Sequence, residues 1–99
     1  MKRFREKPEI TLNTVVQRDP AQEFSKIDDE VVMLSLKNGE YYALNPVASR
    51  IWELIGQKKN VGEITEILIQ EYEVDHETCM TDTLECLQDL RNKALLINP

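Results

Sequence analysis

The stretch from Gly39 to Gly56, GEYYALNPVASRIWELIG, organises the expected fold of this chain. Before it, Asn38-Gly39 is a turn dipeptide between two apolar runs, which is the strongest short-range signal of a β-hairpin. Tyr41 to Leu44 predicts the strand after the turn, because aromatic and apolar residues favour that conformation. Asn45-Pro46 then predicts a helix start. The Asn side chain can accept a hydrogen bond from an unpaired backbone N–H, and proline is tolerated at the first helical position.

The run before the turn, Val31 to Leu36 (VVMLSL), predicts the other strand of the hairpin. Alternation along a strand separates its side chains into two faces. One face is uniformly aliphatic, and we expect it to be buried: Val32, Leu34 and Leu36. The opposite face carries Val31, Met33 and Ser35. On the partner strand, Tyr42 and Leu44 share one face, and Tyr41 and Ala43 share the other.

Three helices are expected after the hairpin. The first runs from Pro46 to about Ile55. The second runs from Val61 to about Tyr72, with Asn60 and Glu63 as a capping box at its start. The third runs from its cap, Asp75, to about Lys93.

Apolar residues at helical spacing predict the buried face of each helix. The first helix is expected to bury Ile51, Trp52, Leu54 and Ile55, with Gly56 placed to cap its end. The second is expected to bury Val61, Ile64, Ile67, Leu68 and Tyr72. The third carries Met80, Thr83, Leu84, Leu87 and Leu90 on one face. Ala94 to Ile97 closes the chain as an extended tail against the core.

The N-terminal third carries weaker signals. Met1 to Glu9 is charged and is expected to be a flexible arm, and Ile10 to Arg18 predicts a first strand or an extended arm. Ala21 to Glu30 is polar and is expected to be a loop, which Phe24 and Ile27 could anchor to the core. The sequence thus predicts one α+β domain over residues 1–99. Its architecture is winged-helix-like, with an N-terminal three-stranded antiparallel sheet followed by three helices.

Composition excludes several classes of partner. The chain has 99 residues and a formal net charge of −6, and its pI is near 4.8. Nucleic acids and anionic membranes require a basic surface, so neither is an expected partner. No apolar run approaches the roughly 20 residues of a membrane-spanning helix, and the basic N-terminus lacks the apolar core of a signal peptide. Cys79 and Cys86 are about 10 Å apart along a helix. That separation is too great for a disulfide, so they are expected to be reduced thiols in a cytoplasmic protein.

Catalytic chemistry has little support in the sequence. His76 is the only histidine, and it stands with Cys79 at the start of the third helix, where two ligands do not make a metal site. A nucleophilic cysteine requires a base and an electropositive setting, whereas Cys79 and Cys86 stand among acidic residues. No phosphate-binding glycine motif is present. We therefore expect no enzyme activity, no metal and no cofactor.

DNA binding is disfavoured by the third helix. A recognition helix presents Arg, Lys, Asn or Gln to base edges. This helix instead presents a series of carboxylates before its first basic residue: Asp75, Glu77, Asp82, Glu85 and Asp89. A winged-helix regulator that binds DNA or another protein remains the alternative function.

The order of these elements resembles the PqqD-like family. The resemblance rests on YYALNPVASRIWELI, preceded by an apolar strand and followed by VGEITEILIQEYEV, and it covers roughly Val31 to Ile97. Members of this family are small peptide-binding domains, also called RiPP recognition elements. They serve pathways that modify ribosomally made peptides, and they do no chemistry themselves.

The resemblance implies a site and a function. In the family, a leader peptide docks as an added strand against the third strand, in a groove walled by that strand and the third helix. On this chain the strand side is Glu40, Tyr41, Tyr42, Ala43 and Leu44, and the helix side is Met80, Thr83, Cys86, Leu87 and Leu90, with Lys93 towards the end. Asp82, Glu85 and Asp89 could pair with a basic leader residue. Which face of the strand lines the pockets stays open.

The implied partners are a precursor peptide and a separate processing enzyme. As a chain of this length, the protein resembles the discrete adaptor of lasso-peptide pathways, which serves a leader peptidase. It also resembles PqqD itself, which serves a radical SAM enzyme. The first of these is favoured by the short linker after the first helix and by the IWELI…VGEI pattern. Independently of the family, an unpaired edge strand can accept an extended peptide by β-augmentation.

Overall fold

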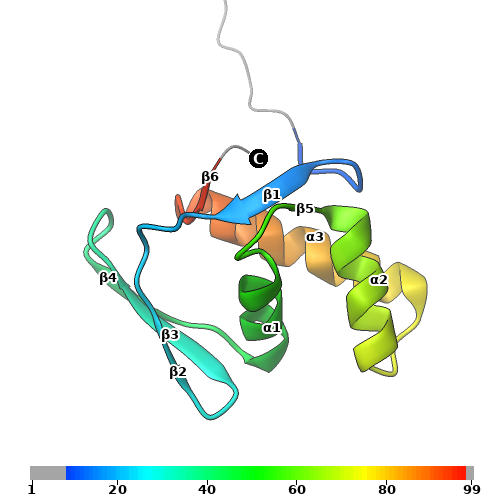
Figure 1. The fold of residues 1–99 in the computed structure, drawn as a ribbon, viewed down its shortest axis with the longest axis horizontal. Coiled ribbons are helices and arrows are strands. Elements are labelled where there is room, and N and C mark those ends of the chain that lie inside the picture. Colours follow the sequence, from blue (N-terminus) through cyan, green and yellow to red (C-terminus); the bar gives the residue numbers. More distant parts are fainter. Residues whose placement is uncertain (1–8, 98–99) are drawn as a thin grey trace, which may run out of the picture.

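The computed structural model describes residues 9–97, and most of the predicted arm, Met1 to Glu9, lies outside them. Figure 1 shows a small sheet at one end of the molecule, helix α2 at the other and helix α1 between them, while helix α3 runs behind from the α2 end toward the side of the sheet. This sheet is antiparallel with the order β2–β3–β4, formed by Ser25–Ile27, Glu30–Ser35 and Glu40–Ala43. The helices are α1 (Pro46–Leu54), α2 (Val61–Glu71) and α3 (His76–Asn92). The predicted α+β class, with a three-stranded antiparallel sheet and three helices, is confirmed.

A second, smaller sheet holds the ends of the chain together. Its order is β5–β1–β6, formed by Lys59–Asn60, Val15–Arg18 and Leu96–Ile97. The N-terminal strand thus pairs with the segment before α2 and with the C-terminal tail, and it does not join the hairpin. None of the helices within residues 9–97 is both long and apolar enough to cross a membrane.

The third strand of the hairpin sheet was not predicted. It is β2, which lies in the segment expected to be a loop, Ala21 to Glu30. The strand has three residues, and all of them are exposed, so it has no apolar period to reveal it. The turn between β2 and β3 contains Asp28 at φ 55, a conformation that aspartate tolerates better than most residues.

The predicted core face of β3 was wrong. The structure buries Val31, Met33 and Ser35, whereas Leu36 of the predicted set is 88% exposed. The cause is that α1 docks on the face that carries Val31, Met33 and Ser35. There, the Ser49 hydroxyl accepts a hydrogen bond from the Val31 N–H at 2.8 Å. Because side chains alternate, this choice places every residue of the other set on the outside. Ser35 can be buried because its hydroxyl accepts from the Asn38 N–H at 3.2 Å.

The predicted turn and helix N-caps are confirmed, whereas Gly56 does not form the predicted left-handed cap of α1, since the C-cap is Ile55 and Gly56 has no positive φ. Gly39 has φ +67, as the hairpin turn requires. The Asn45 side chain accepts from the Ala48 N–H at 2.8 Å, and the Asp75 side chain accepts from the Thr78 N–H at 2.9 Å. Asn60 and Glu63 form the reciprocal capping box at the start of α2. Each cap satisfies a donor that the helix itself leaves unpaired.

The core is centred on α1. Trp52 is fully buried, and Phe24 meets its ring edge-on at a centroid distance of 5.8 Å, so Phe24 anchors the first loop as expected. Ile27, the other expected anchor, is 61% exposed and does not reach the core, because it lies on the outer face of β2. The buried side of α3 is turned slightly from the prediction, because it includes Cys79 while Met80 and Leu84 are only partly buried. The buried α3 residues are Cys79, Thr83, Leu87 and Leu90.

Candidate peptide-binding edge

The candidate site begins with the position of β4 at the edge of its sheet. In the order β2–β3–β4, the strand β4 pairs with β3 on one side only. Within residues 9–97, no other strand pairs with its second side. An unpaired edge presents backbone N–H and C=O groups that another extended chain can use.

The ladder between β3 and β4 shows which backbone groups are free. The Leu44 N–H donates to the Val31 carbonyl at 2.8 Å, so the main-chain groups of Leu44 point toward β3. In an antiparallel pair these directions alternate, and Tyr42 and Glu40 therefore also point toward β3. The N–H and C=O groups of Tyr41 and Ala43 point to the open side. These two residues are separated by one position, which is the spacing at which an added strand forms its bonds.

Ser49 joins this strand to α1. Its hydroxyl accepts from the Val31 N–H and donates to the Leu44 carbonyl at 3.0 Å. The hydroxyl therefore replaces the backbone bond that would otherwise continue the β3–β4 ladder. The end of β4 is held by a buried side chain, so the position of the edge depends on α1.

The other end of β4 is tied to the C-terminal end of α3. The Tyr42 ring lies under the Lys93 ammonium, 5.2 Å from Nζ to the ring centroid. The Asn38 amide donates both to the Tyr42 hydroxyl, at 3.0 Å, and to the Lys93 carbonyl, at 2.9 Å. Lys37 also donates to the Ala94 carbonyl at 3.3 Å. The hairpin turn thus fixes the distance between the strand edge and the helix.

Sequence reasoning missed Asn38 and Ser49. The sequence assigns Asn38 only to the turn, whereas one of its side-chain hydrogen bonds in the structure reaches the Lys93 carbonyl, 55 positions away in the chain. Ser49 is one polar residue inside an amphipathic helix, where it gives no sequence signal. Only the fold shows that both position the strand.

The predicted helix side of the site divides into two groups. Thr83, Leu87 and Leu90 are at most 1% exposed and belong to the core, so they support the site from the interior of the protein. Met80 and Cys86 are partly buried and retain some accessible surface. Cys86 precedes Lys93 by two helical turns and so lies on the same side of α3. The assignment of these five residues to peptide binding stays a prediction.

The surroundings of Cys86 favour a neutral thiol. Burial raises its pKa to about 11, and the Asp89 carboxylate acts in the same direction. Burial also raises the pKa of Cys79. A nucleophilic cysteine needs the opposite shift, so both thiols act here as small apolar groups.

Two other candidate chemistries, metal binding and DNA reading, concern His76 and the carboxylates of α3. Among residues 9–97, no three His, Cys, Asp or Glu side chains gather as a metal site. His76 is exposed, with Nε2 3.4 Å from the Glu66 carboxylate. Asp82, Glu85 and Asp89 are exposed on α3, which places carboxylates where a DNA-reading helix needs donors.

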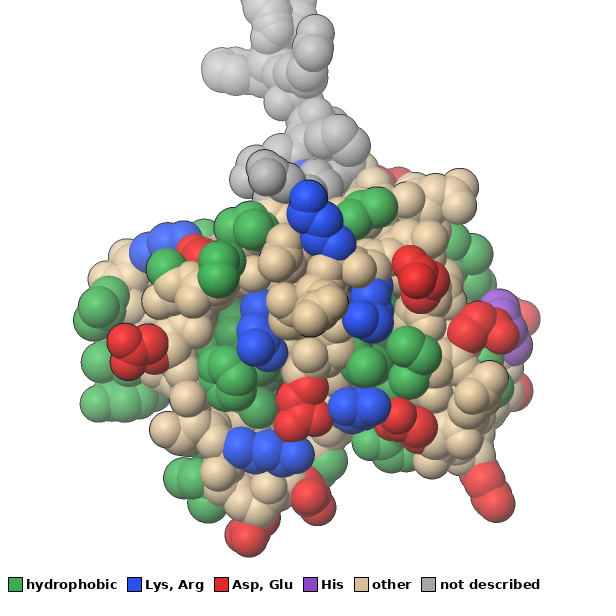
Figure 2. All heavy atoms as spheres, in the orientation of Figure 1, with side chains coloured by type: hydrophobic (Ala, Val, Ile, Leu, Met, Phe, Trp, Pro, Cys, Tyr) green, Lys and Arg blue, Asp and Glu red, His purple; other side chains and the backbone are tan. Residues whose placement is uncertain are grey.

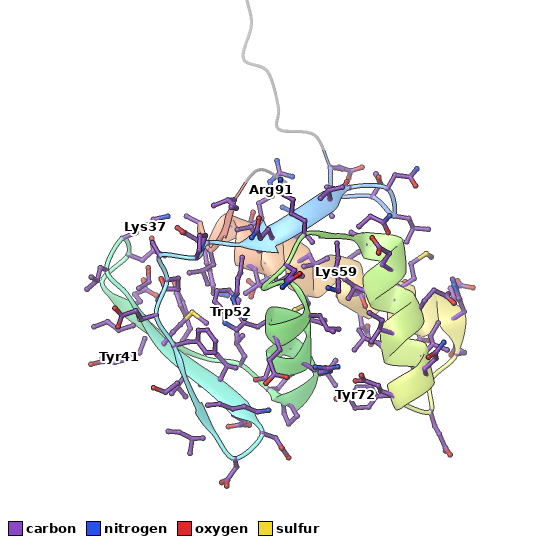
Figure 3. The ribbon with its side chains drawn as sticks, in the orientation of Figure 1. Lys37, Tyr41, Trp52, Lys59, Tyr72 and Arg91 are labelled. Carbon is purple, nitrogen blue, oxygen red and sulfur yellow. The ribbon has the colours of Figure 1, made fainter. Side chains whose placement is uncertain are left out.

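On the strand side, exposure separates the two faces of β4. Tyr41 is 81% exposed, and Figure 3 shows it on the outer side of the hairpin. Glu40 and Ala43 are also exposed. Tyr42 is half-buried and Leu44 is buried. An added strand would therefore meet open backbone at Tyr41 and Ala43, with the Tyr42 ring holding the strand against α3.

Comparison with known proteins identifies the family. The family model described as coenzyme PQQ synthesis protein D (PqqD) matches residues 30–96. The chain belongs to the PqqD family. The matched span begins and ends within one residue of the resemblance recognised in the sequence, and it contains β3, β4 and all three helices.

Two solved structures are similar to this PqqD family member. One is described as TbiB1 in complex with the TbiA(beta) leader peptide. It has 40% sequence identity and a TM-score of 0.76, with coverage of 84% of this chain and 96% of that one. The other is the solution NMR structure of the PqqD truncation of Methylobacterium extorquens PqqCD, described as a functional, stand-alone RiPP recognition element. Its identity is 23% and its TM-score 0.68, with coverage of 83% and 87%, and it supports the fold alone. A comparison with curated proteins finds no match.

Proposed function

We propose that this protein is one peptide-binding domain that holds the leader segment of a ribosomally made precursor peptide and presents the peptide to a separate processing enzyme. The observation that carries the proposal is the open edge of β4 in a PqqD family member. The relative at 40% identity has a structure in complex with a leader peptide, which supports the same class of ligand here. The leader would add as a strand along β4.

The binding energy in this proposal comes mainly from the main chain. The N–H and C=O groups of Tyr41 and Ala43 would pair with the leader, and each net hydrogen bond contributes about 1 kcal/mol. Met80 and Cys86 would give the leader apolar surface on the side of α3. Asp82, Glu85 and Asp89 would attract a basic leader residue and would add to the association rate more than to the affinity.

The domain would leave the chemistry to its partner. The processing enzyme we favour is the leader peptidase of a lasso-peptide pathway, and a radical SAM enzyme is the next candidate. The lasso-type preference gains support from the match to TbiB1 and its leader peptide. The free thiols of Cys79 and Cys86 agree with a cytoplasmic location.

Proline at Ala43 tests the proposal. Ala43→Pro removes an N–H that points to the open side, so it should leave the β3–β4 ladder intact while it blocks an added strand. We expect the dissociation constant for the leader peptide to rise roughly tenfold or more. Isothermal titration of the purified protein with the leader of the precursor encoded beside its gene measures this. Ala43→Ser keeps the N–H and is the matched control.

Two results would contradict the proposal. If the wild-type protein binds none of the neighbouring precursors, the leader-binding function is wrong. If Ala43→Pro binds as tightly as Ala43→Ser, the leader does not use this edge. Salt-dependent binding to duplex DNA would instead favour the regulator alternative.

A further inference from the structure

The outer face of the β2–β3–β4 sheet is apolar and exposed. It carries the side chains that the docking of α1 left on the outside of β3, together with neighbours on β2, β4 and the turn. Ile27 is 61% exposed, Leu36 is 88% exposed and Tyr41 is 81% exposed. Leu34, at 39%, adds to this surface. Figure 2 shows hydrophobic side chains gathered at the end of the molecule where Figure 1 places the β3–β4 hairpin.

An open pocket of about 590 Å³ lies on this face. One wall is the loop before β2, which includes Gln22 and Phe24, and the other wall includes Leu34, Leu36 and Tyr41. The loop is held in place because the Gln22 side chain donates to the Leu34 carbonyl at 3.0 Å. Lys37 and Asp19, which both line the pocket, form an ion pair at 2.8 Å. The pocket is therefore shaped by fixed contacts, and a protruding apolar side chain could enter it.

The rim of this face is acidic. Exposed carboxylates border the apolar surface: Glu23, Asp28, Asp29 and Glu30. The lysines on the same elements already have partners, since Lys26 pairs with Glu53 and Lys37 pairs with Asp19. The face thus combines an apolar centre with a negative border, which is the layout of a protein–protein interface that selects a basic partner.

We infer that this outer face is the docking surface for a folded partner protein that presents an apolar protrusion flanked by Lys and Arg. This inference rests on the proposed function, and it identifies the partner as the processing enzyme. Tyr41 makes the two sites continuous, because its main chain lies at the open edge of β4 and its side chain lies on the outer face. An enzyme docked there would be adjacent to the leader on β4.

The charges argue against a second copy of this chain. Each copy carries a net charge of −6 and the same acidic rim. A two-fold contact between identical faces would bring these carboxylates together. An anionic membrane or a nucleic acid would meet the same repulsion.

Two surface variants separate docking from leader binding. Leu36→Ser removes an apolar side chain that stands on a turn and is 88% exposed, so the fold does not depend on it. Glu23→Lys reverses one rim charge at the pocket. Val15→Thr, in the other sheet, and Glu73→Lys, after α2, are the matched controls. The probe is the purified processing enzyme encoded beside the precursor gene, and each variant is titrated separately with that enzyme and with the leader peptide.

We expect Leu36→Ser and Glu23→Lys each to weaken binding of the enzyme by at least about fivefold, while leader affinity stays within twofold of wild type. The controls should leave both affinities unchanged. If the two variants bind the enzyme as the wild type does, the docking surface is wrong even where the leader binds. If the leader fails to bind the wild type, the proposed function fails independently.

Two further measurements would detect other occupants of the outer face. Sedimentation that shows a dimer, lost in Leu36→Ser, would assign the face to a second copy and overturn the inference. The first eight residues, MKRFREKP, are basic and contain Phe4. If NMR methyl signals of Leu34 and Leu36 shift when residues 1–8 are removed, the face is occupied by the chain itself, which would also contradict the inference.

Discussion

Helix α1 and strand β4 are neighbours in one stretch of sequence and behave as opposites in the fold. Ile51, Trp52 and Ser49 of α1 are at most 1% exposed, whereas Tyr41 of β4 is 81% exposed. The helix contributes buried side chains, and the strand contributes open backbone. The conspicuous Trp helix is therefore scaffold, and the plainer strand before it carries the proposed binding function. Substitutions in the two elements should separate stability from binding.

The largest expected effect is at the centre of α1. Trp52→Ala removes the largest fully buried side chain and its contact with Phe24. We expect a loss of about 3–5 kcal/mol in the free energy of unfolding, because a large cavity remains. Urea denaturation followed by far-UV circular dichroism measures it. Trp52→Phe should cost clearly less, since the Trp52 Nε1–H has no hydrogen-bond partner among the described residues and its removal costs nothing in hydrogen bonding. Equal losses in the two variants would contradict this account.

A smaller effect is expected where the two elements meet. Ser49→Ala leaves the buried Val31 N–H and the Leu44 carbonyl without their shared partner. We expect the free energy of unfolding to fall by about 1–3 kcal/mol, which is the cost of unsatisfied buried groups. Ser25→Ala, on the exposed strand β2, is the control and should change stability little. If Ser49→Ala is as stable as wild type, the hydroxyl bridge does not hold β4.

A third effect should appear in binding more than in stability. Asn38→Ala removes the amide bonds to Tyr42 and to the Lys93 carbonyl. Because these bonds are exposed, we expect a stability loss of at most about 1 kcal/mol. Leader affinity should fall by a larger factor than in the control Asn13→Ala, because the hairpin is then free to move relative to α3. Titration of both variants with the same leader peptide provides the measurement. Equal affinities would show that leader binding does not depend on the Asn38 hydrogen bonds between the hairpin and α3.

The smallest effect concerns the surface of α1 and depends on pH. Arg50 donates two hydrogen bonds to Glu71, which lower the pKa of that carboxyl. A group whose pKa is lower in the folded state stabilises the fold above its ordinary value, here 4.5, and loses that contribution as the pH falls through the folded value. Because the pair is exposed, Arg50→Gln should cost only about 0.2–1 kcal/mol at pH 7. Urea denaturation at several pH values should show the difference from wild type shrinking below pH 4.5. A difference that grows on acidification would have the wrong sign for this pair.

Local signals made much of the fold predictable. The turn at Gly39 and the caps Asn45, Asn60 and Asp75 stand where the sequence placed them. Each depends on groups within three residues of one another. The family resemblance named the strand of the candidate site on the same basis, because it follows the order of these local elements.

Features that depend on contacts between residues far apart in sequence were not predictable in the same way. The strand β2 is exposed throughout and has no apolar period, and the aliphatic face of β3 proved to be the outer one. Both faces of that strand are apolar enough to be buried, so composition alone could not select between them. The division of the α3 residues into core and accessible groups likewise depends on how the helix is rotated against α1 and α2.

The sequence by itself determined where the β3–β4 hairpin turns and where the three helices begin, because capping and turn formation are decided by groups close together along the chain. The tertiary structure decided which face of β3 is buried, which edge of β4 stays open, and that an apolar surface remains outside. These outcomes follow from the docking of α1 through Ser49 and of the hairpin through Asn38. Such contacts join residues far apart in sequence, and a strand with two apolar faces acquires an inside and an outside only when they form.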